Sequence, residues 1–329
     1  MTAPSNPWRR GLRNAAVLGL LVLAALLLLN RGELSALAHV FATLPLALLA
    51  SALAHFPQIA FTAWAWLVLL PPEDRPSLRR MLMLRWYREG GDALLPAGAV
   101  MGQAAITRLM IRDGMPADLA AGTATIGISL EAISQTIFTL IGLAMFLTIR
   151  RDADVSAFVV GAACAAILAG VLIALQRPPA LNLLRRVLQR LARRWPKLEP
   201  DWIDRFQAAL LRLHADRRAL AVAVLLHVGC WICGAVEMML VLHIIGHPIS
   251  FAEALVIEAF AQVLRNAGFL LPGSAGVQEG AIIAGGLLVG VPITAAINAA
   301  LVRRTREILI GGAGLMAWRR DEMRGAAHP

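Results

Sequence analysis

The sequence has little charge and almost no lysine. Only 16% of its 329 residues are charged, whereas 58% are hydrophobic, and the mean hydropathy is +0.67. The single lysine, Lys197, does not stand in a GxxxxGK[ST] phosphate loop, a motif that the sequence lacks. These absences exclude a P-loop ATPase and an ordinary soluble domain. We therefore expect a membrane protein that does not hydrolyse ATP directly.

Cysteine and histidine are also scarce, with three and seven residues. Cys230 and Cys233 have the spacing of a redox motif, but no βαβ pattern surrounds them, which favours small packing residues in an apolar helix. His243 and His247 stand four residues apart at the end of an apolar run, where a loop role is favoured over a metal site. We expect no metal and no cofactor.

Long apolar runs dominate the rest of the chain. A transmembrane helix needs about 20 apolar residues, and six runs qualify: 15–29, 44–70, 119–149, 155–175, 220–245 and 294–318. The first run also resembles a signal peptide, but its cleavage would leave an odd number of spans, so an uncleaved span is favoured. The sequence thus predicts a single all-α polytopic membrane domain.

The net charge of +10 collects in short loops beside these runs, which argues against nucleic-acid binding. Six spans with a cytoplasmic N-terminus place 20 basic residues inside and only Arg31, Arg150 and Arg151 outside. This asymmetry predicts that both termini are cytoplasmic. Segment 177–218 carries eleven of the inside charges and has one apolar face. It is expected to be an amphipathic helix on the anionic leaflet or a linker folded over the bundle.

An internal repeat relates two parts of the chain. LLPAGAVMGQAAI at 94–106 matches LLPGSAGVQEGAI at 270–282, and the same offset of 176 pairs Glu131 with Glu307. Three spans separate the two copies, so they should open toward opposite sides of the membrane. We expect inverted-topology repeats over 15–149 and 155–318, each with a re-entrant hairpin, at about 79–111 and 251–289.

The irregular backbone at the Pro-Gly breaks of these hairpins must be shielded from lipid. Irregular backbone at membrane depth survives only against protein or a wet cavity. The predicted hairpin tips, which should meet near the midplane, are Pro96, Gly98, Pro272, Gly273 and Gly276.

Charged and amide side chains cluster in and around the hairpins. Each intramembrane charge costs roughly 2.5–3.5 kcal/mol on insertion, so each is a hypothesis for a functional site. The candidates for substrate binding are Arg88, Glu89, Gln103, Arg265, Gln278 and Glu279. The candidates for bracing ion pairs are Glu131, Glu258, Gln262, Arg303, Arg304 and Glu307. Half-helix N-termini and arginines would suit an anionic head group, but a purely structural role for these charges stays open.

Three segments carry a family resemblance: REGGDALLPAGAVMGQ at 88–103, Arg265 with LLPGSAGVQEG at 270–280, and LVRRTREILIGGAGL at 301–315. On these motifs the chain resembles the flippase-like family that includes the transmembrane domain of lysylphosphatidylglycerol synthases, and within it the hopanoid-biosynthesis-associated membrane proteins. The resemblance implies a lipid flippase or transporter for a polar or amphiphilic lipid, with membrane lipids and hopanoid-biosynthesis proteins as partners. Nothing after Trp318 resembles the synthases' aminoacyl-transferase domain, so that activity is not expected.

Two other functions stay open. An intramembrane lipid-modifying enzyme could use Glu279 or Glu89 as a general base, although no nucleophile and base stand at a characteristic spacing. A non-transporting scaffold for hopanoid biosynthesis would need the charges only for folding.

Overall fold

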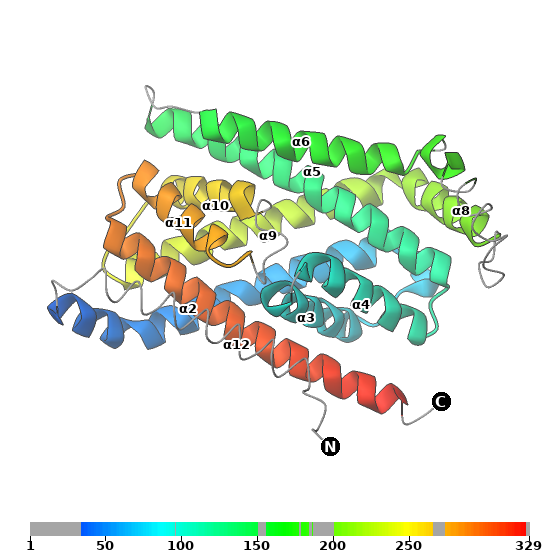
Figure 1. Cartoon of the computed structure of the whole chain (residues 1–329), viewed down its shortest axis with the longest axis horizontal. Coiled ribbons are helices and arrows are strands. Elements are labelled where there is room, and N and C mark those ends of the chain that lie inside the picture. The colour runs from blue at the N-terminus through cyan, green and yellow to red at the C-terminus, as the bar shows by residue number, and fades with distance from the viewer. Residues whose placement is uncertain are drawn as a thin grey trace, which may run out of the picture.

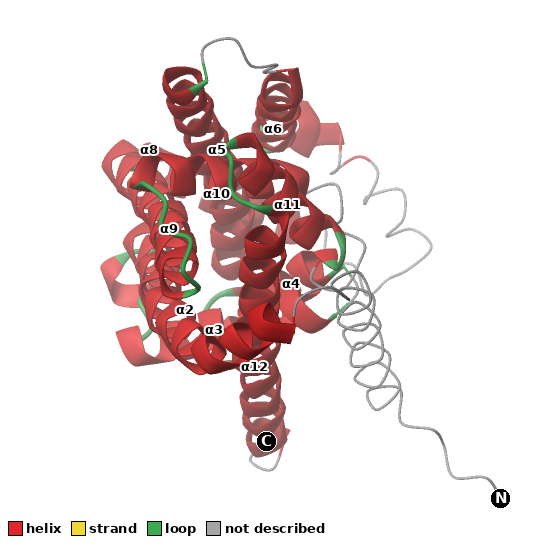
Figure 2. Cartoon of the chain, turned by 90° about the vertical axis from the view of Figure 1, so that its left-hand side faces the viewer, coloured by secondary structure: helices red, strands yellow, loops and turns green. Residues whose placement is uncertain are grey.

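The computed structural model describes residues 34–95, 97–150, 156–177, 179–183, 186, 201–265 and 274–326. These residues form helices and connecting loops, with no strand among them (Figure 2). Several predicted features lie outside the described residues, namely the first span at 15–29, the tip residues Pro96, Pro272 and Gly273, and much of the basic segment 177–218.

Two halves of the chain share one order of helices. The first half consists of α2 (Leu34–Leu69), α3 (Leu78–Leu94), α4 (Gly98–Arg112) and α5 (Ala117–Ile149), with a short 3-10 turn, η1 (Pro72–Asp74), after α2. The second half consists of α9 (Arg217–Ile244), α10 (Phe251–Arg265), α11 (Val277–Leu288) and α12 (Ile293–Ala326). Between them lie α6 (Ser156–Leu175) and α8 (Asp201–Ala215). Each half is thus a long helix, two short helices and another long helix.

Three of the described helices are long and apolar enough to cross a membrane: Thr43–Leu69 within α2, Ala117–Ile149 in α5 and Arg217–Ile244 in α9. They agree closely with the predicted runs 44–70, 119–149 and 220–245. The predicted class, an all-α polytopic membrane protein, is confirmed. The count of six spans and the re-entry of the hairpins stay predictions.

The short helices form two pairs at opposite ends of the molecule. In Figure 1 the α10–α11 pair lies in the left part of the bundle and the α3–α4 pair lies to the right. Each pair contacts a long helix of the other half, since α3 packs on α12 and α10 packs on α5. The first long helices of the halves, α2 and α9, also lie along each other. The two halves therefore interlock.

Glycine makes the contact between α3 and α12 possible. A Cβ at Gly90 would stand 2.6 Å from the backbone oxygen of Gly311 and 2.8 Å from the backbone nitrogen of Leu315. Only a residue without a side chain allows two helix backbones to approach so closely. This packing holds the α3–α4 pair against α12.

Helix α8 is the described part of the predicted amphipathic segment. Its buried side chains include Phe206, Leu210 and Leu213, and it packs against α5, while Trp202 stacks on Phe206 with ring centroids 5.2 Å apart. This part of the segment is folded onto the bundle, as one of the two expected arrangements requires.

Candidate functional site

A polar cavity lies between the two short pairs. The cavity is partly open to the outside, and its lining comes from α2, α3, α5, α9, α10, α11 and α12. Ten charged residues line it, five arginines and five carboxylates: Arg85, Arg88, Arg265, Arg303, Arg306, Glu89, Asp92, Glu131, Glu258 and Glu307. The lining charges therefore balance, and the cavity can hold water and an ionic group inside an apolar bundle.

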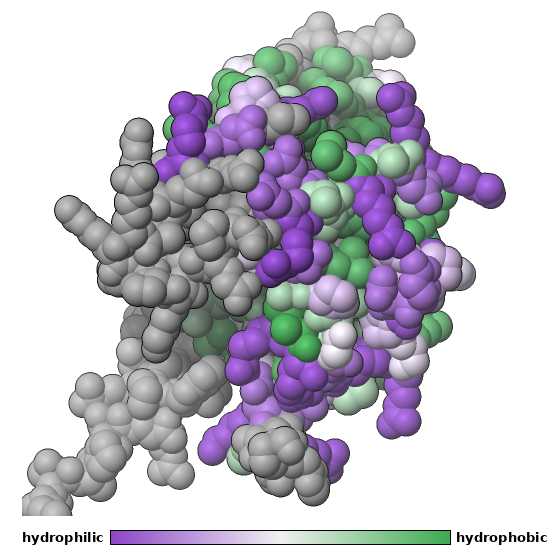
Figure 3. All heavy atoms as spheres, turned by 90° about the vertical axis from the view of Figure 1, so that its right-hand side faces the viewer, coloured by the Kyte–Doolittle hydropathy of each residue, from purple (hydrophilic) through white to green (hydrophobic). Residues whose placement is uncertain are grey.

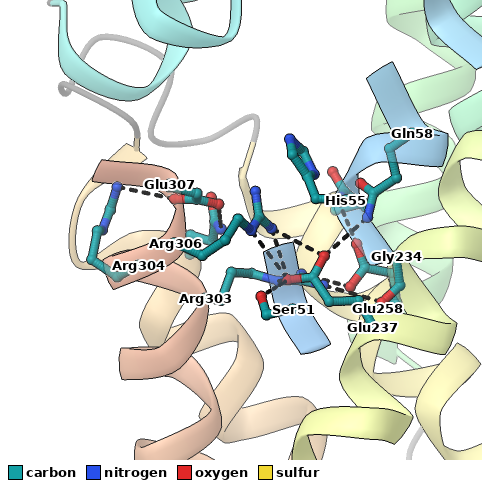
Figure 4. Close-up of polar contacts among 12 residues, drawn as sticks. Ser51, His55, Gln58, Gly234, Glu237, Glu258, Arg303, Arg304, Arg306 and Glu307 are labelled. Carbon is teal, nitrogen blue, oxygen red and sulfur yellow. Dashed lines mark hydrogen bonds and ion pairs between the residues drawn. The ribbon is translucent and has the colours of Figure 1, made fainter. Parts of the chain in front are cut away.

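Glu237 on α9 is the centre of a buried network beside this cavity (Figure 4). It accepts hydrogen bonds from Ser51 Oγ at 2.6 Å and Gln58 Nε2 at 2.9 Å, both on α2, and from Arg306 Nη2 on α12 at 2.8 Å. The Glu237 side chain is only 2% exposed. One carboxylate therefore ties three helices together, and its charge is compensated by well-placed donors.

Arg303 makes a second buried connection from α12. Its Nη1 donates to Glu258 Oε2 on α10 at 2.6 Å, and its Nη2 donates to the backbone oxygen of Gly234 on α9 at 3.2 Å. Gln262 Nε2 donates to the other Glu258 oxygen at 2.7 Å, which is the contact that their spacing of four residues favours. These bonds fix α10 between α9 and α12.

The start of α11 is joined to α12 by two further contacts. Glu279 Oε2 accepts from the backbone nitrogen of Gly276, the cap of α11, at 2.7 Å, and its other oxygen pairs with Arg304. Gln278 Nε2 donates to Glu307 Oε1 at 2.6 Å, and Arg304 Nη1 lies 3.3 Å from Glu307 Oε2. Glu279 thus holds a helix end in place instead of lining the cavity.

The charges of the first half face the cavity more openly. Arg88 Nη2 lies 2.9 Å from Glu131 Oε2 on α5, and its Nε lies 3.5 Å from Asp92 Oδ2. His55 Nε2 on α2 lies 3.5 Å from Glu89 Oε2. The Glu131 and Glu89 side chains are 25% and 28% exposed, so water reaches both carboxylates.

Two cavity arginines have no ion-pair partner among the described residues, Arg85 and Arg265. The Arg85 guanidinium lies 6.0 Å from the centre of the Trp66 ring, within cation–π range. Arg265 is the last residue of α10 and is partly exposed. Because no carboxylate in the described part of the chain lies within ion-pair distance of it, the Arg265 guanidinium keeps donors with which it can bind an anion.

The cavity unites most of the predicted site residues. Of the candidates for substrate binding, Arg88, Glu89, Arg265 and Gln278 line it, as do the predicted bracing residues Glu131, Glu258, Gln262, Arg303 and Glu307. Gln103, Glu279 and Arg304 do not line it. Gln103 is buried on α4, and its amide makes no hydrogen bond to any described residue. Of the predicted tip residues, Gly98 begins α4 and Gly276 caps α11.

Several functional side chains were not among the predicted site residues. His55, Gln58 and Glu237 lie inside the runs 44–70 and 220–245, which were selected as spans for their apolar content. Ionisable residues inside a membrane span mark candidate sites, and by this rule Glu237 and His55 are also candidates. Within the described ranges no three His, Cys, Asp or Glu side chains are placed to hold a metal ion.

A separate ionic cluster closes one end of the bundle. Arg80 on α3 and Arg112 on α4 contact Asp321 near the end of α12, at 2.6 and 2.9 Å. Many hydrophilic side chains lie over this end (Figure 3). Burial acts to raise the pKa of Asp321, but hydrogen bonds from the two guanidinium groups outweigh it and leave the pKa below its ordinary value. Asp321 therefore stays ionised at neutral pH.

The family model of the lysylphosphatidylglycerol synthase TM region matches residues 15–313. The chain belongs to this family. A search of curated proteins and a search of solved structures each found no match. The resemblance read from the motifs is thus confirmed for the lysylphosphatidylglycerol synthase TM family, while the hopanoid branch stays a prediction. Membership relates the function of this multi-pass membrane protein to membrane lipids.

Proposed function

We propose that this member of the lysylphosphatidylglycerol synthase TM family moves a lipid with a polar head group across the membrane. The observation that carries the proposal is the charged cavity between the two short helix pairs. The free energy of moving a head group through hydrocarbon is high, because each charge at the bilayer centre costs roughly 2.5–3.5 kcal/mol on insertion scales. A cavity with balanced charges offers it a polar path while the acyl chains stay in lipid.

The arrangement of the helices supports alternating access. We infer that the α3–α4 and α10–α11 pairs are the re-entrant hairpins of two inverted repeats, opening to opposite sides of a bacterial inner membrane. Their positions at opposite ends of the bundle and their shared helix order agree with this inference (Figure 1). Secondary transporters built in this way bind their substrates where the two repeats meet. The cluster around Asp321 would then lie on the cytoplasmic side.

Arg265 is the residue that we assign to the lipid phosphate. A guanidinium without a carboxylate partner can form two parallel hydrogen bonds to phosphate oxygens. Arg88, Glu89 and Gln278 complete the head-group contacts from α3 and α11. Glu279, which pairs with Arg304 and caps α11, is assigned a bracing role with Glu237, Glu258 and the arginines of α12.

The test is lipid translocation in liposomes that contain the purified protein. A fluorescent phospholipid in the inner leaflet becomes sensitive to an external quencher only after it crosses. We expect the native protein to accelerate this loss of fluorescence and Arg265→Gln to slow it about tenfold or more, because a hydrogen bond to a charged group contributes about 1.5–3 kcal/mol.

The matched control is Arg108→Gln. This side chain is 66% exposed at the end of the bundle, where it pairs with Glu322, so its loss should leave translocation unchanged. If anionic, zwitterionic and hopanoid-bearing lipids all cross at the rate of protein-free liposomes, the proposal is wrong. Mass spectrometry of lipids from a deletion strain separates the alternatives, because a missing chemical species would indicate a lipid-modifying enzyme.

A further inference from the structure

The cavity carboxylates differ in the cation that neutralises them. Four of the five lie within 4.0 Å of an arginine: Asp92 and Glu131 near Arg88, Glu258 near Arg303, and Glu307 near Arg304. An arginine keeps its proton at any physiological pH, because its pKa exceeds 12 in water. The cationic side of these four contacts therefore keeps its charge.

Glu89 is the fifth carboxylate, and its partner is a histidine. The His55 Nε2 to Glu89 Oε2 distance is 3.5 Å, and both side chains line the cavity. Neither ring nitrogen of His55 makes a hydrogen bond to a described residue, so the ring is not held as a structural donor. Histidine is the side chain whose charge ordinarily changes between pH 5 and 8. The cationic partner of Glu89 is therefore a side chain that can release its proton, whereas an arginine cannot.

The surroundings of the pair contain other ionic groups on every adjacent helix. They are Arg85 and Arg88 on α3, Glu131 on α5, Glu237 on α9, Arg265 on α10 and Arg306 on α12. Glu131 and Glu237 are each bonded to an arginine. The second buried histidine, His227, does not line the cavity. Among the described residues, His55 with Glu89 is thus the histidine–carboxylate pair of the cavity wall, and water reaches it through the Glu89 carboxylate, which is 28% exposed.

We propose that His55 and Glu89 form a proton-binding site that couples lipid movement to proton movement, an inference that rests on the proposed lipid transport. A proton from water in the cavity binds the imidazole ring, and the charge of the pair rises from −1 to 0. Glu89 lies within electrostatic range of Arg265. Protonation of the imidazole cancels the net negative charge of the pair, which would otherwise repel a lipid phosphate at Arg265.

The direction of coupling follows from this change in charge. A proton and an anionic head group each favour binding of the other, because the protonated pair no longer opposes the phosphate. Such mutual preference is a coupling free energy between two sites, and it is reciprocal. The proton and the anionic lipid should therefore move in the same direction.

The experiment measures inward movement of fluorescent phosphatidylglycerol in liposomes, with the outside one pH unit more acidic than the inside or at equal pH. We expect the acidic exterior to raise the rate for the native protein by up to about tenfold, since one pH unit corresponds to a factor of ten in proton activity. In His55→Gln the ratio of the two rates should fall to one. The matched control, His243→Gln, changes an exposed histidine at the end of α9 and should keep the native ratio.

A second measurement needs no variant. A pH-sensitive dye inside the liposomes should report acidification when the native protein carries phosphatidylglycerol inward. Lipid movement without a dye response or an effect of the gradient would overturn the coupling alone, as would a native gradient response in His55→Gln. A native protein that moves no lipid at either pH would instead contradict the proposed function, and the coupling with it.

Discussion

The two halves of the molecule share one order of helices but expose their charges differently. In the second half, Glu237 and Glu258 are each 2% exposed and are bonded to arginines of α12. In the first half, Glu89 and Glu131 are 28% and 25% exposed and face the cavity. The carboxylates of the second half thus brace the wall, whereas those of the first half lie where water reaches them.

The degree of burial explains this difference. A carboxylate removed from water must have its charge compensated by donors on all sides, and Glu237 has such donors on α2 and α12. Such a group cannot release its partners to bind a substrate without leaving buried charges unpaired. A carboxylate with a quarter of its surface exposed keeps water as an alternative partner, so it can exchange contacts at a lower cost.

The strongest test of this comparison replaces one carboxylate in each half. Glu237→Gln leaves Arg306 without a charged partner in a buried site, and the loss of one member of a buried ion pair typically costs about 3–5 kcal/mol. Glu131→Gln should cost much less, because the site is wetter and Arg88 keeps Asp92. Thermal unfolding of the detergent-solubilised variants measures both. Equal losses would mean that the halves do not differ in their bracing.

A second test uses the repeat positions Gln103 and Glu279. Gln103 is buried, its amide makes no hydrogen bond to the described residues, and an unsatisfied buried polar group costs about 1–3 kcal/mol. Gln103→Met removes that group at similar volume, so we expect a higher unfolding midpoint and unchanged lipid translocation. Glu279→Met should lower the midpoint, because it removes the cap of α11 and the contact with Arg304. Slower translocation in Gln103→Met would instead support the predicted role of Gln103 in substrate binding.

The helices could be predicted well because they depend on local composition. The apolar runs predict both ends of the apolar segments of α2, α5 and α9 to within a few residues. The offset of 176 also identified Glu131 and Glu307 as equivalent, and each lies within ion-pair distance of an arginine, Arg88 or Arg304.

The partners within the site could not be predicted, because they depend on contacts between distant helices. Arg303 and Glu307 stand four residues apart on α12, a spacing that favours contact between them, but Arg303 bonds to Glu258 and Glu307 bonds to Gln278. Glu237 was missed for a different reason, since one carboxylate hardly changes the mean hydropathy of a span of 28 residues. The pairing of His55 with Glu89 joins α2 to α3, and nothing in either segment alone indicates it.

The smallest predicted effect concerns the ionic cluster at the end of α12, away from both halves of the cavity wall. Because the pKa of Asp321 is lowered, its contacts with Arg80 and Arg112 stabilise the fold above the ordinary aspartate pKa and are lost as pH falls through the lowered value. Partly exposed pairs contribute about 0–1 kcal/mol. Asp321→Asn should therefore speed hydrogen exchange in the last turns of α12 at pH 7, and the difference from the native protein should shrink as the pH falls below the ordinary aspartate pKa and through the lowered one. A difference that persists in acid would mean that packing, and not charge, holds this end of α12 on α3 and α4.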